Sequence, residues 1–161
     1  MIFVTVGTQD KPFTRLIHAV EDAVREGKII DEVIVQAGNT EYESDVLKIL
    51  NYIPFEEFSK YLEKADIIIT HGGVGSILSA LKLKKRVIAV PRLSKYNEHK
   101  NDHQLQVIKK MTDDGYILSC EDEKEIAKKV EEAKSFVTKE YKSNTENFIK
   151  EFNEVLEDVF K

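Results

Sequence analysis

Residues 66–76 read Asp66-Ile67-Ile68-Ile69-Thr70-His71-Gly72-Gly73-Val74-Gly75-Ser76, and they carry the clearest indication of fold class in the sequence. Three consecutive isoleucines are typical of a strand that is buried on both faces, as strands of parallel sheets are. The glycine-rich turn that follows leads into apolar residues at helical spacing, which predicts a helix over about residues 74–83. A buried strand, a glycine turn and a helix in direct succession are typical of an α/β domain.

The same alternation continues to both sides of this stretch. Further strands are expected at 2–6, 33–35, 49–53, 86–90 and 116–118. Helices are expected from Pro12 to Gly27, from Pro54 with Phe55, Phe58 and Leu62 on one face, at 103–111, and around Ile126, Val130, Ala133 and Val137. A last amphipathic helix is expected at 143–160. The sequence therefore predicts one Rossmann-like α/β domain over 1–161, whose mostly parallel sheet is covered on both faces.

Composition excludes several classes of protein. The chain has 161 residues, of which 42% are apolar, as in a folded domain rather than a disordered chain. A net charge of −5 argues against a nucleic-acid binder that works through a strong basic field. No apolar run approaches the roughly 20 residues of a membrane span, and the first residues lack the basic start of a signal peptide. The single cysteine, Cys120, cannot form an internal disulfide, so we expect a reducing, cytoplasmic setting.

The turn from His71 to Ser76 is the first candidate ligand site. Ligands of open α/β sheets bind where loops leave the carboxyl ends of the strands. Glycines let a ligand approach the backbone, and a helix N-terminus presents free N–H groups, so the turn suits a phosphate or diphosphate. Its spacing is neither that of a dinucleotide fingerprint nor that of a P-loop. The alternative for this segment is a tight strand-to-helix turn without a ligand. His71 itself could be a phosphate contact, a base or a structural turn residue.

The loop after the first strand, Gly7-Thr8-Gln9-Asp10, occupies an equivalent position. The Thr8 hydroxyl could donate a hydrogen bond to a phosphate oxygen. Helix capping by Thr8 or Asp10 is the alternative.

A long polar segment that ends in Asp102, His103 and Gln104 follows the fifth expected strand. These side chains suit sugar hydroxyls, whereas a helix N-cap is the alternative for Asp102. His99 and His103 are four residues apart with Glu98 nearby, but the spacing of a zinc-protease motif is absent, so no metal site is expected.

Three segments together carry a resemblance to a known family. They are Val4-Thr5-Val6-Gly7-Thr8-Gln9, His71-Gly72-Gly73-Val74-Gly75-Ser76 and Asn101-Asp102-His103-Gln104-Leu105. In this order they resemble the C-terminal domain of glycosyltransferase family 28. They are most similar to small soluble subunits of two-component enzymes, such as the N-acetylglucosaminyltransferase subunit acting on dolichol-linked sugar and bacterial capsule or exopolysaccharide subunits. The resemblance implies the C-terminal half of a GT-B enzyme.

The resemblance also implies roles for individual residues. Thr8 and the Gly72-Gly73 turn would contact the diphosphate, the backbone near Ile53 would meet the uracil, and Gln104 would hold sugar hydroxyls. Related enzymes often place a ribose-binding glutamate where this chain has Ser79. The full set of candidate substrate-binding residues is Thr8, Gln9, Ile53, His71, Gly72, Gly73, Gly75, Ser76, Ser79, Asp102, His103 and Gln104.

The function implied is that of the donor-binding, catalytic subunit of a two-component hexosyltransferase. It would move a hexose or N-acetylhexosamine from a UDP-sugar to a lipid-linked acceptor in polysaccharide synthesis, without cofactor or metal. A membrane-anchored partner would hold the acceptor and keep this chain peripheral at the inner face of the membrane. No general base is assigned to this chain. The alternative is a non-catalytic subunit that binds the nucleotide sugar or activates its partner.

Overall fold

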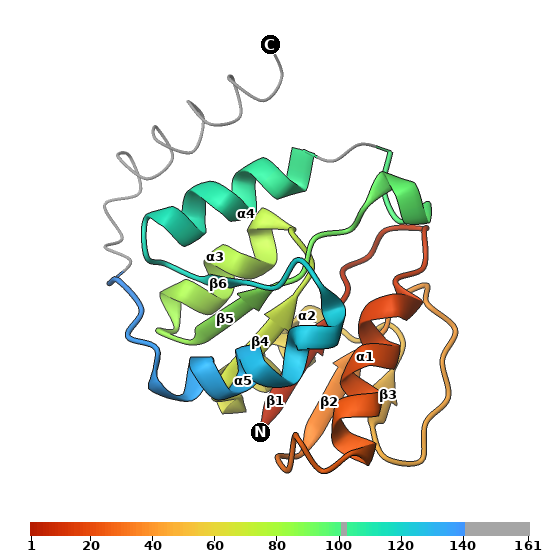
Figure 1. Cartoon of the computed structure of the whole chain (residues 1–161). Helices are drawn as coiled ribbons and strands as arrows, with labels where there is room; N and C mark the ends of the chain where they lie inside the picture. The colour runs from red at the N-terminus through yellow and green to blue at the C-terminus, as the bar shows by residue number, and fades with distance from the viewer. Residues whose placement is uncertain (101–102, 141–161) are drawn as a thin grey trace.

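Six parallel strands form one open sheet in the computed structural model, which describes residues 1–100 and 103–140. The strand order is β3-β2-β1-β4-β5-β6 (Figure 1). The strands are β1 (Ile2–Thr5), β2 (Val33–Gln36), β3 (Lys48–Leu50), β4 (Ile67–Thr70), β5 (Arg86–Ala89) and β6 (Leu118–Ser119). The expectation of a single α/β domain is confirmed, and every strand pair in the described part is parallel.

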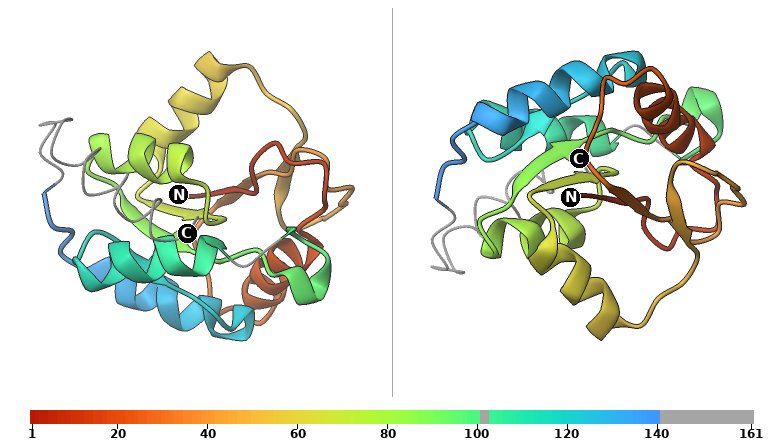
Figure 2. Two further views of the ribbon diagram at one scale, coloured as in Figure 1. Left: turned by 90° about the horizontal axis from the view of Figure 1, so that it is seen from above. Right: turned by 90° about the horizontal axis from the view of Figure 1, so that it is seen from below.

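Helices cover both faces of the sheet. They are α1 (Thr14–Arg25), α2 (Phe55–Lys64), α3 (Val74–Lys82), α4 (His103–Asp113) and α5 (Ile126–Ser135), with short 3₁₀ turns η1 (Ser94–Tyr96) and η2 (Glu123–Glu125). Helices α1 and α5 pack in one apolar cluster, and α2, α3 and α4 pack in the other. The opposite placement of α1 and α5 relative to α2 and α3 is visible from above and below (Figure 2).

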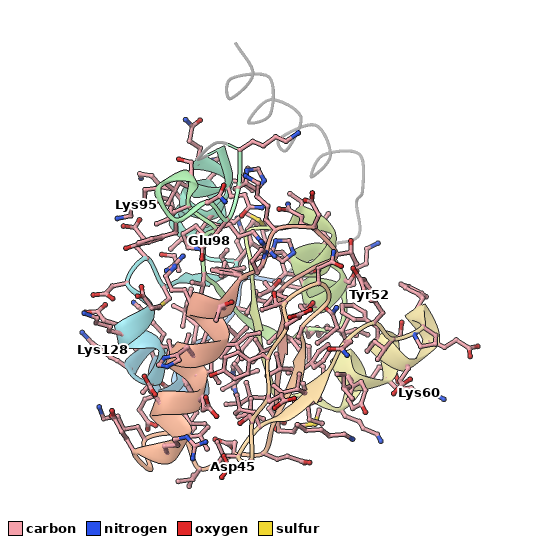
Figure 3. All side chains as sticks on the ribbon, turned by 90° about the vertical axis from the view of Figure 1, so that its right-hand side faces the viewer. Asp45, Tyr52, Lys60, Lys95, Glu98 and Lys128 are labelled. Atoms are coloured by element: carbon pink, nitrogen blue, oxygen red, sulfur yellow. The ribbon has the colours of Figure 1, made fainter. Side chains whose placement is uncertain are left out.

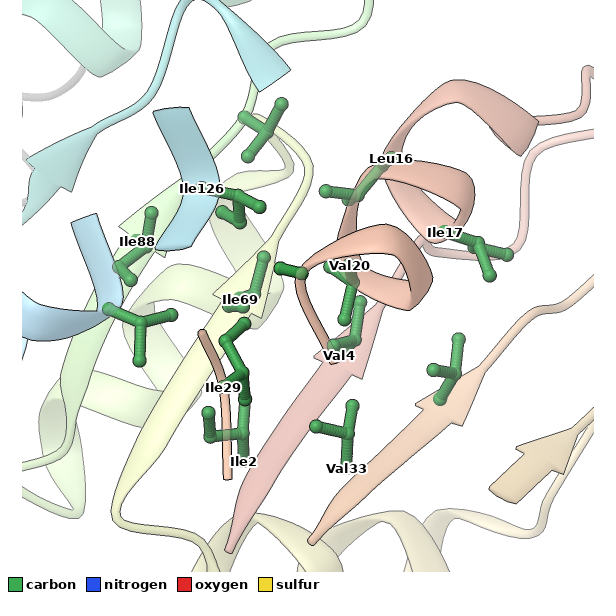
Figure 4. Packing of buried hydrophobic residues seen from close by; sticks show 14 of the residues in the cluster. Ile2, Val4, Leu16, Ile17, Val20, Ile29, Val33, Ile69, Ile88 and Ile126 are labelled. Atoms are coloured by element: carbon green, nitrogen blue, oxygen red, sulfur yellow. The ribbon is translucent and has the colours of Figure 1, made fainter. Parts of the chain in front are cut away.

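Alternation along the strands explains why both faces are apolar. Ile2 and Val4 of β1 point toward α1, whereas Phe3 between them belongs to the opposite cluster. On the α1 side they meet Leu16 and Val20 (Figure 4). All five side chains are at most 1% exposed. Each strand therefore needs apolar residues at successive positions, and this requirement appears in the sequence as a continuous apolar run.

The order in which strands are added to the sheet reverses at β1. Thr5 at its end is in register with Gln36 of β2 on one side and Thr70 of β4 on the other. The chain builds β2 and β3 on the first side before it crosses to β4. The loops after β1 and β4 therefore leave the sheet side by side, and a crevice opens between them at the carboxyl edge.

Some boundaries differ from the expected ones. Pro12 precedes helix α1. Strand β3 covers 48–50 instead of the expected 49–53, and β6 covers 118–119 instead of 116–118, because both are short edge strands with little apolar patterning. Phe55 does not share the buried face of α2 but is 79% exposed. Val137 lies beyond α5 and is 86% exposed.

The amphipathic helix expected at 143–160 lies outside the described residues. Among the residues that are described, no helix has the length and apolar character needed to cross a membrane.

Candidate functional site

A cleft of about 480 Å³ lies at the carboxyl edge of β1, β2 and β4. Its lining residues are Thr5, Gly7, Thr8, Gln9, Gln36, Tyr52, Ile53, Phe55, Phe58, His71, Gly73, Gly75 and Ser76. The structure thus brings together seven residues singled out from the sequence, namely Thr8, Gln9, Ile53, His71, Gly73, Gly75 and Ser76. They come from the loops after β1, β3 and β4, as the switch in strand order requires.

The N-terminus of α3 forms one wall of this cleft. Gly73 is the N-cap residue, and no side chain caps the first turn. The unpaired N–H groups at a helix start and the positive end of its dipole favour an anion. Gly75 lies in this first turn, and a Cβ atom on it would meet no atom within 4 Å. The wall therefore offers backbone N–H groups with open space in front of them.

His71 closes the bottom of the cleft between two glycines. His71 is only 6% exposed, and its Nδ1 has no hydrogen-bond partner among the described residues. A Cβ atom on Gly7 would lie 2.5 Å from Nε2 of His71, and one on Gly73 would lie 2.2 Å from Cε1. Burial, followed by the positive charges of Arg92 and His99, lowers the pKa of His71 to about 4. The imidazole is therefore neutral at physiological pH.

A hydrogen-bonded belt that the sequence did not reveal supports the floor of the cleft. The Thr5 hydroxyl donates to Oε1 of Gln36 (2.6 Å), and Nε2 of Gln36 donates to the carbonyl of Asn51 (3.2 Å). Both side chains are almost fully buried. The belt ties the ends of β1, β2 and β3 together. A polar residue at the last position of an apolar strand is the signal that could have found it.

Aromatic side chains form the opposite wall, and these were also missed as site residues. Tyr52 is 58% exposed, and Phe55 is 79% exposed. Phe58, half-buried beside them, packs edge-on against Phe3 at 5.5 Å between ring centroids. Tyr52 lies on the side of α2, away from Glu98 above α1 (Figure 3). Exposed rings at the mouth of a cleft can stack on a planar ligand.

Two other predicted residues contact each other behind the cleft. Gln104 is 9% exposed, and its Oε1 accepts a hydrogen bond from the backbone N–H of Arg92 (3.3 Å). A Cβ atom on Gly72 would lie 2.7 Å from Cβ of Gln104. The glycine turn and the start of α4 are therefore in contact, but neither Gly72 nor Gln104 is among the residues that line the cleft.

Three predicted residues remain. The Ser79 hydroxyl donates to the carbonyl of Gly75 (2.8 Å), one turn earlier in α3. Asp102 lies outside the described residues. His103 is the first residue of α4, and its side chain is likewise outside the description.

The carboxylate of Glu98, considered above as a possible metal ligand, is bound by other groups. It accepts hydrogen bonds from the Arg15 guanidinium (2.9 Å) and the Leu93 N–H (3.2 Å). Within residues 1–100 and 103–140, no three histidine, cysteine or acidic side chains gather as a metal site would require.

A larger groove of about 650 Å³ lies between α1 and the start of α5. It is lined by side chains of both charges from α1, from the turn after it and from η2, including Asp22, Lys28 and Lys124. No strand end contributes to it. The smaller cleft is therefore the better candidate, because strand ends, loop backbone and a helix N-terminus converge there.

Comparison with known proteins identifies one family and two relatives that carry the same name. Residues 1–159 match the family described as glycosyltransferase family 28 C-terminal domain. The human UDP-N-acetylglucosamine transferase subunit ALG13 is 30% identical over 131 residues, which cover 74% of this chain and 11% of that protein. The subunit of the same name from Candida albicans is 29% identical over 77 residues, covering 48% of this chain and 25% of that protein. This chain thus spans only a small part of the length of these relatives.

Solved structures share the fold. The NMR structure of ALG13 superposes with a TM-score of 0.60 at 23% identity, covering 91% of this chain and 92% of that one. The glycosyltransferase SnogD from Streptomyces nogalater gives a TM-score of 0.59 at 20% identity, covering 82% of this chain and 34% of that one.

Proposed function

Because the chain belongs to the glycosyltransferase family 28 C-terminal domain family, and has the architecture of the C-terminal half of a GT-B enzyme, we propose that it is the donor-binding, catalytic subunit of a two-component glycosyltransferase. Its donor is a UDP-sugar that carries a hexose or an N-acetylhexosamine. Its acceptor is a lipid-linked sugar of a polysaccharide pathway, such as capsule or exopolysaccharide synthesis. The ALG13 relatives, which are named as subunits of a UDP-N-acetylglucosamine transferase, support a division of the enzyme between chains.

The cleft between the loops after β1 and β4 is the observation that carries this proposal. In the proposed complex the diphosphate lies against the first turn of α3, where Gly73, Gly75 and Ser76 line the cleft, with Thr8 opposite. The uracil lies at the other end, against the Ile53 backbone and the exposed rings of the aromatic wall. A volume of about 480 Å³ is within the range of small-ligand sites.

The chemistry proposed for this arrangement needs no metal on this chain. An acceptor hydroxyl attacks the anomeric carbon of the donor, the bond from that carbon to the diphosphate breaks, and UDP leaves with the added negative charge. Fixed N–H groups at a helix start can stabilise that charge where it develops. The proton of the acceptor passes to a base that we place on the partner.

The donor sugar extends, in this proposal, toward the start of α4. Gln104 and Asp102 hold its hydroxyls, with His103 beside them. Ser79 or a residue of the partner replaces the ribose-binding glutamate of related enzymes. The partner is membrane-anchored and carries the acceptor, so that this chain works at the inner face of the membrane.

A non-catalytic nucleotide-sugar-binding subunit is the second candidate. Ser79 stands where related enzymes often have a ribose-binding glutamate, and its hydroxyl donates to the Gly75 carbonyl. This departure from the pattern of catalytic relatives is the observation that keeps the second candidate beside the first. The two candidates share the ligand and differ in whether this chain contributes to transfer.

Calorimetry with the purified chain tests the shared part. UDP and UDP-sugars should bind more tightly than uridine, because the α3 N-terminus favours the phosphates. Absence of UDP binding, or equal affinity for UDP and uridine, would contradict the site. Transfer by the co-purified pair then separates the candidates. A site variant of this chain that still binds both its partner and the UDP-sugar should abolish transfer if this chain is catalytic, and should leave transfer intact if this chain only holds the donor.

A further inference from the structure

Arg92 is the largest side chain buried in the described part of the molecule, at 1% exposed. It follows β5 and reaches beneath the loop that joins β1 to α1. Its Nη2 donates to the Val6 carbonyl (2.7 Å), and its Nη1 donates to the carbonyls of Lys11 (2.7 Å) and Glu98 (3.1 Å). Val6 and Lys11 bracket the cleft-lining residues 7–9. One guanidinium therefore fixes both ends of that loop.

The backbone of Arg92 joins the other two segments of the site. Its N–H donates to Gln104, and Gln104 packs against Gly72 of the glycine turn. Arg92 is thus hydrogen-bonded to two of the three segments that the sequence singled out, and it reaches the third through the packing contact between Gln104 and Gly72. Neither its position in a loop nor its charge predicts this burial.

The charge of Arg92 is unusual in what surrounds it. Among the described residues its guanidinium donates to three carbonyl oxygens, and its Nε has no hydrogen-bond partner there. The Glu98 carboxylate is hydrogen-bonded to Arg15 instead, and no carboxylate of the described residues lies within ion-pair distance of Arg92. Burial lowers the pKa of Arg92, and the more distant negative charges of Glu98 and Asp10 offset only part of that effect. Phe13 covers the guanidinium, 4.9 Å from its ring centroid. A buried charge with no directly paired counter-ion lowers the folding stability of the protein.

We propose that Arg92 is a positioning residue whose guanidinium shapes the 6–11 loop and whose charge, left without a carboxylate partner among the described residues, favours a diphosphate in the adjacent cleft. The inference rests on the proposed function for the identity of the ligand. Arg92 does not line the cleft, so it acts through the loop and through its field rather than by contact with the ligand.

The field of Arg92 reaches the cleft at His71. Two positive charges lower the pKa of His71, and the effect of Arg92 is larger than that of His99. His71 lines the cleft between Gly7 and Gly73, so the charge acts where the phosphates are proposed to bind. An anion in the cleft would offset that charge without any change in the fold.

Three substitutions separate the charge from the hydrogen bonds. Arg92→Met removes both, Arg92→Gln keeps an amide donor without charge, and Arg92→Lys keeps the charge without the planar fork. UDP and uridine affinities are measured on each folded variant by calorimetry. The His71 pKa is measured on the same ligand-free proteins by NMR titration of its imidazole.

We expect Arg92→Gln and Arg92→Met to lose at least about tenfold in UDP affinity and less than about threefold in uridine affinity, because only UDP carries the phosphates. Arg92→Lys should keep the ratio of the two affinities. The pKa of His71 should rise in the two neutral variants and not in Arg92→Lys. If Arg92→Met does not fold, Arg92→Gln and Arg92→Lys decide.

Equal losses for UDP and uridine, or an unchanged His71 pKa in the neutral variants, would overturn the proposed charge effect and leave a purely structural arginine. This failure differs from failure of the proposed function, in which the unaltered protein would not bind UDP at all. The His71 titration needs no ligand and therefore tests the field in either case.

Discussion

The imidazole of His71 occupies the space that a side chain on Gly73 would need. A Cβ atom on Gly73 would lie 2.2 Å from Cε1 and 2.6 Å from Nε2 of His71. The backbone of Gly73 is in an ordinary extended conformation, with φ −75°. Glycine is therefore required here by a side-chain contact and not by backbone strain. The turn and the buried histidine are one packing unit.

This contact predicts an interaction between two substitutions. Gly73→Ala should destabilise the protein by about 1–3 kcal/mol, because the added methyl overlaps a ring that is itself buried. In a His71→Ala background the same change should cost only about 0.5 kcal/mol, the preference for glycine over alanine at an N-cap. Urea unfolding of the four proteins gives the coupling energy. An equal cost in both backgrounds would show that His71 is not what excludes the methyl group.

Burial of His71 predicts a pH dependence of stability. Its pKa is about 4 in the folded protein and about 6.5 when exposed, so between these values the unfolded chain binds a proton that the folded protein does not. The resulting stability is fully present above pH about 6.5 and is lost as the pH falls, by about 2 kcal/mol at pH about 5.

The measurement is the free energy of unfolding of the natural protein and of His71→Gln at both ends of this range. Glutamine does not titrate, so contributions of the other histidines cancel in the comparison. Parallel pH profiles of the two proteins would mean that His71 is not held neutral.

The strand at 67–70 and the turn after it were predictable because their signals are local. Three consecutive isoleucines require burial on both faces, and glycines directly after them mark the turn. Edge strand β3 carries no comparable pattern, since its residues are exposed or half-buried, and the predicted strand ended three residues too late.

Arg92 and Gln36 could not be found in this way. An arginine in a loop is ordinarily exposed, and this one is buried because carbonyls at positions 6, 11 and 98 converge on it. Gln36 is likewise hydrogen-bonded to Thr5 of β1 and to Asn51, which directly follows β3. Such partners are distant in the sequence, and only the fold brings them together.

A second polar cluster, on the far side of α1, should affect stability without affecting the ligand. Glu21 is 9% exposed and accepts hydrogen bonds from Tyr42, Ser44 (2.7 Å) and Arg25 (3.0 Å). These bonds, that of Tyr42 first, hold the pKa of Glu21 below its ordinary value. Tyr42→Phe should cost about 1–2 kcal/mol in unfolding free energy, because a buried carboxylate loses a donor.

The matched control is Tyr96→Phe, which removes the hydroxyl of a tyrosine that is 50% exposed and should change stability by less than about 0.5 kcal/mol. Since the folded pKa of Glu21 is lowered, the deficit of Tyr42→Phe should shrink as the pH falls into the range where carboxylates protonate. A change in UDP affinity in Tyr42→Phe would show that this cluster is coupled to the cleft.

Donor binding should not require a divalent metal. The proposed phosphate contacts are backbone N–H groups of α3, which stabilise negative charge without a cation. UDP affinity should therefore change by less than about twofold when a chelator is added. Loss of binding with chelator, restored by magnesium or manganese, would replace this view with a metal-bridged diphosphate.

Gly75 offers the sharpest test of the phosphate position, because here stability and binding should move in opposite directions. A Cβ atom on Gly75 meets nothing within 4 Å, and its backbone is helical, so a side chain is accommodated by the protein itself. Gly75→Ala should raise the unfolding free energy by up to about 1 kcal/mol, and Gly75→Leu should fold as well, since both are better helix formers than glycine.

Gly75 nevertheless lines the cleft, and the leucine side chain would occupy the space in front of the first-turn N–H groups. We therefore expect Gly75→Leu to lose at least about tenfold in UDP affinity, with Gly75→Ala between it and the natural protein. Melting temperature and calorimetry on the same preparations give both quantities. A Gly75→Leu protein that is stable and binds UDP with unchanged affinity would place the diphosphate elsewhere in the cleft.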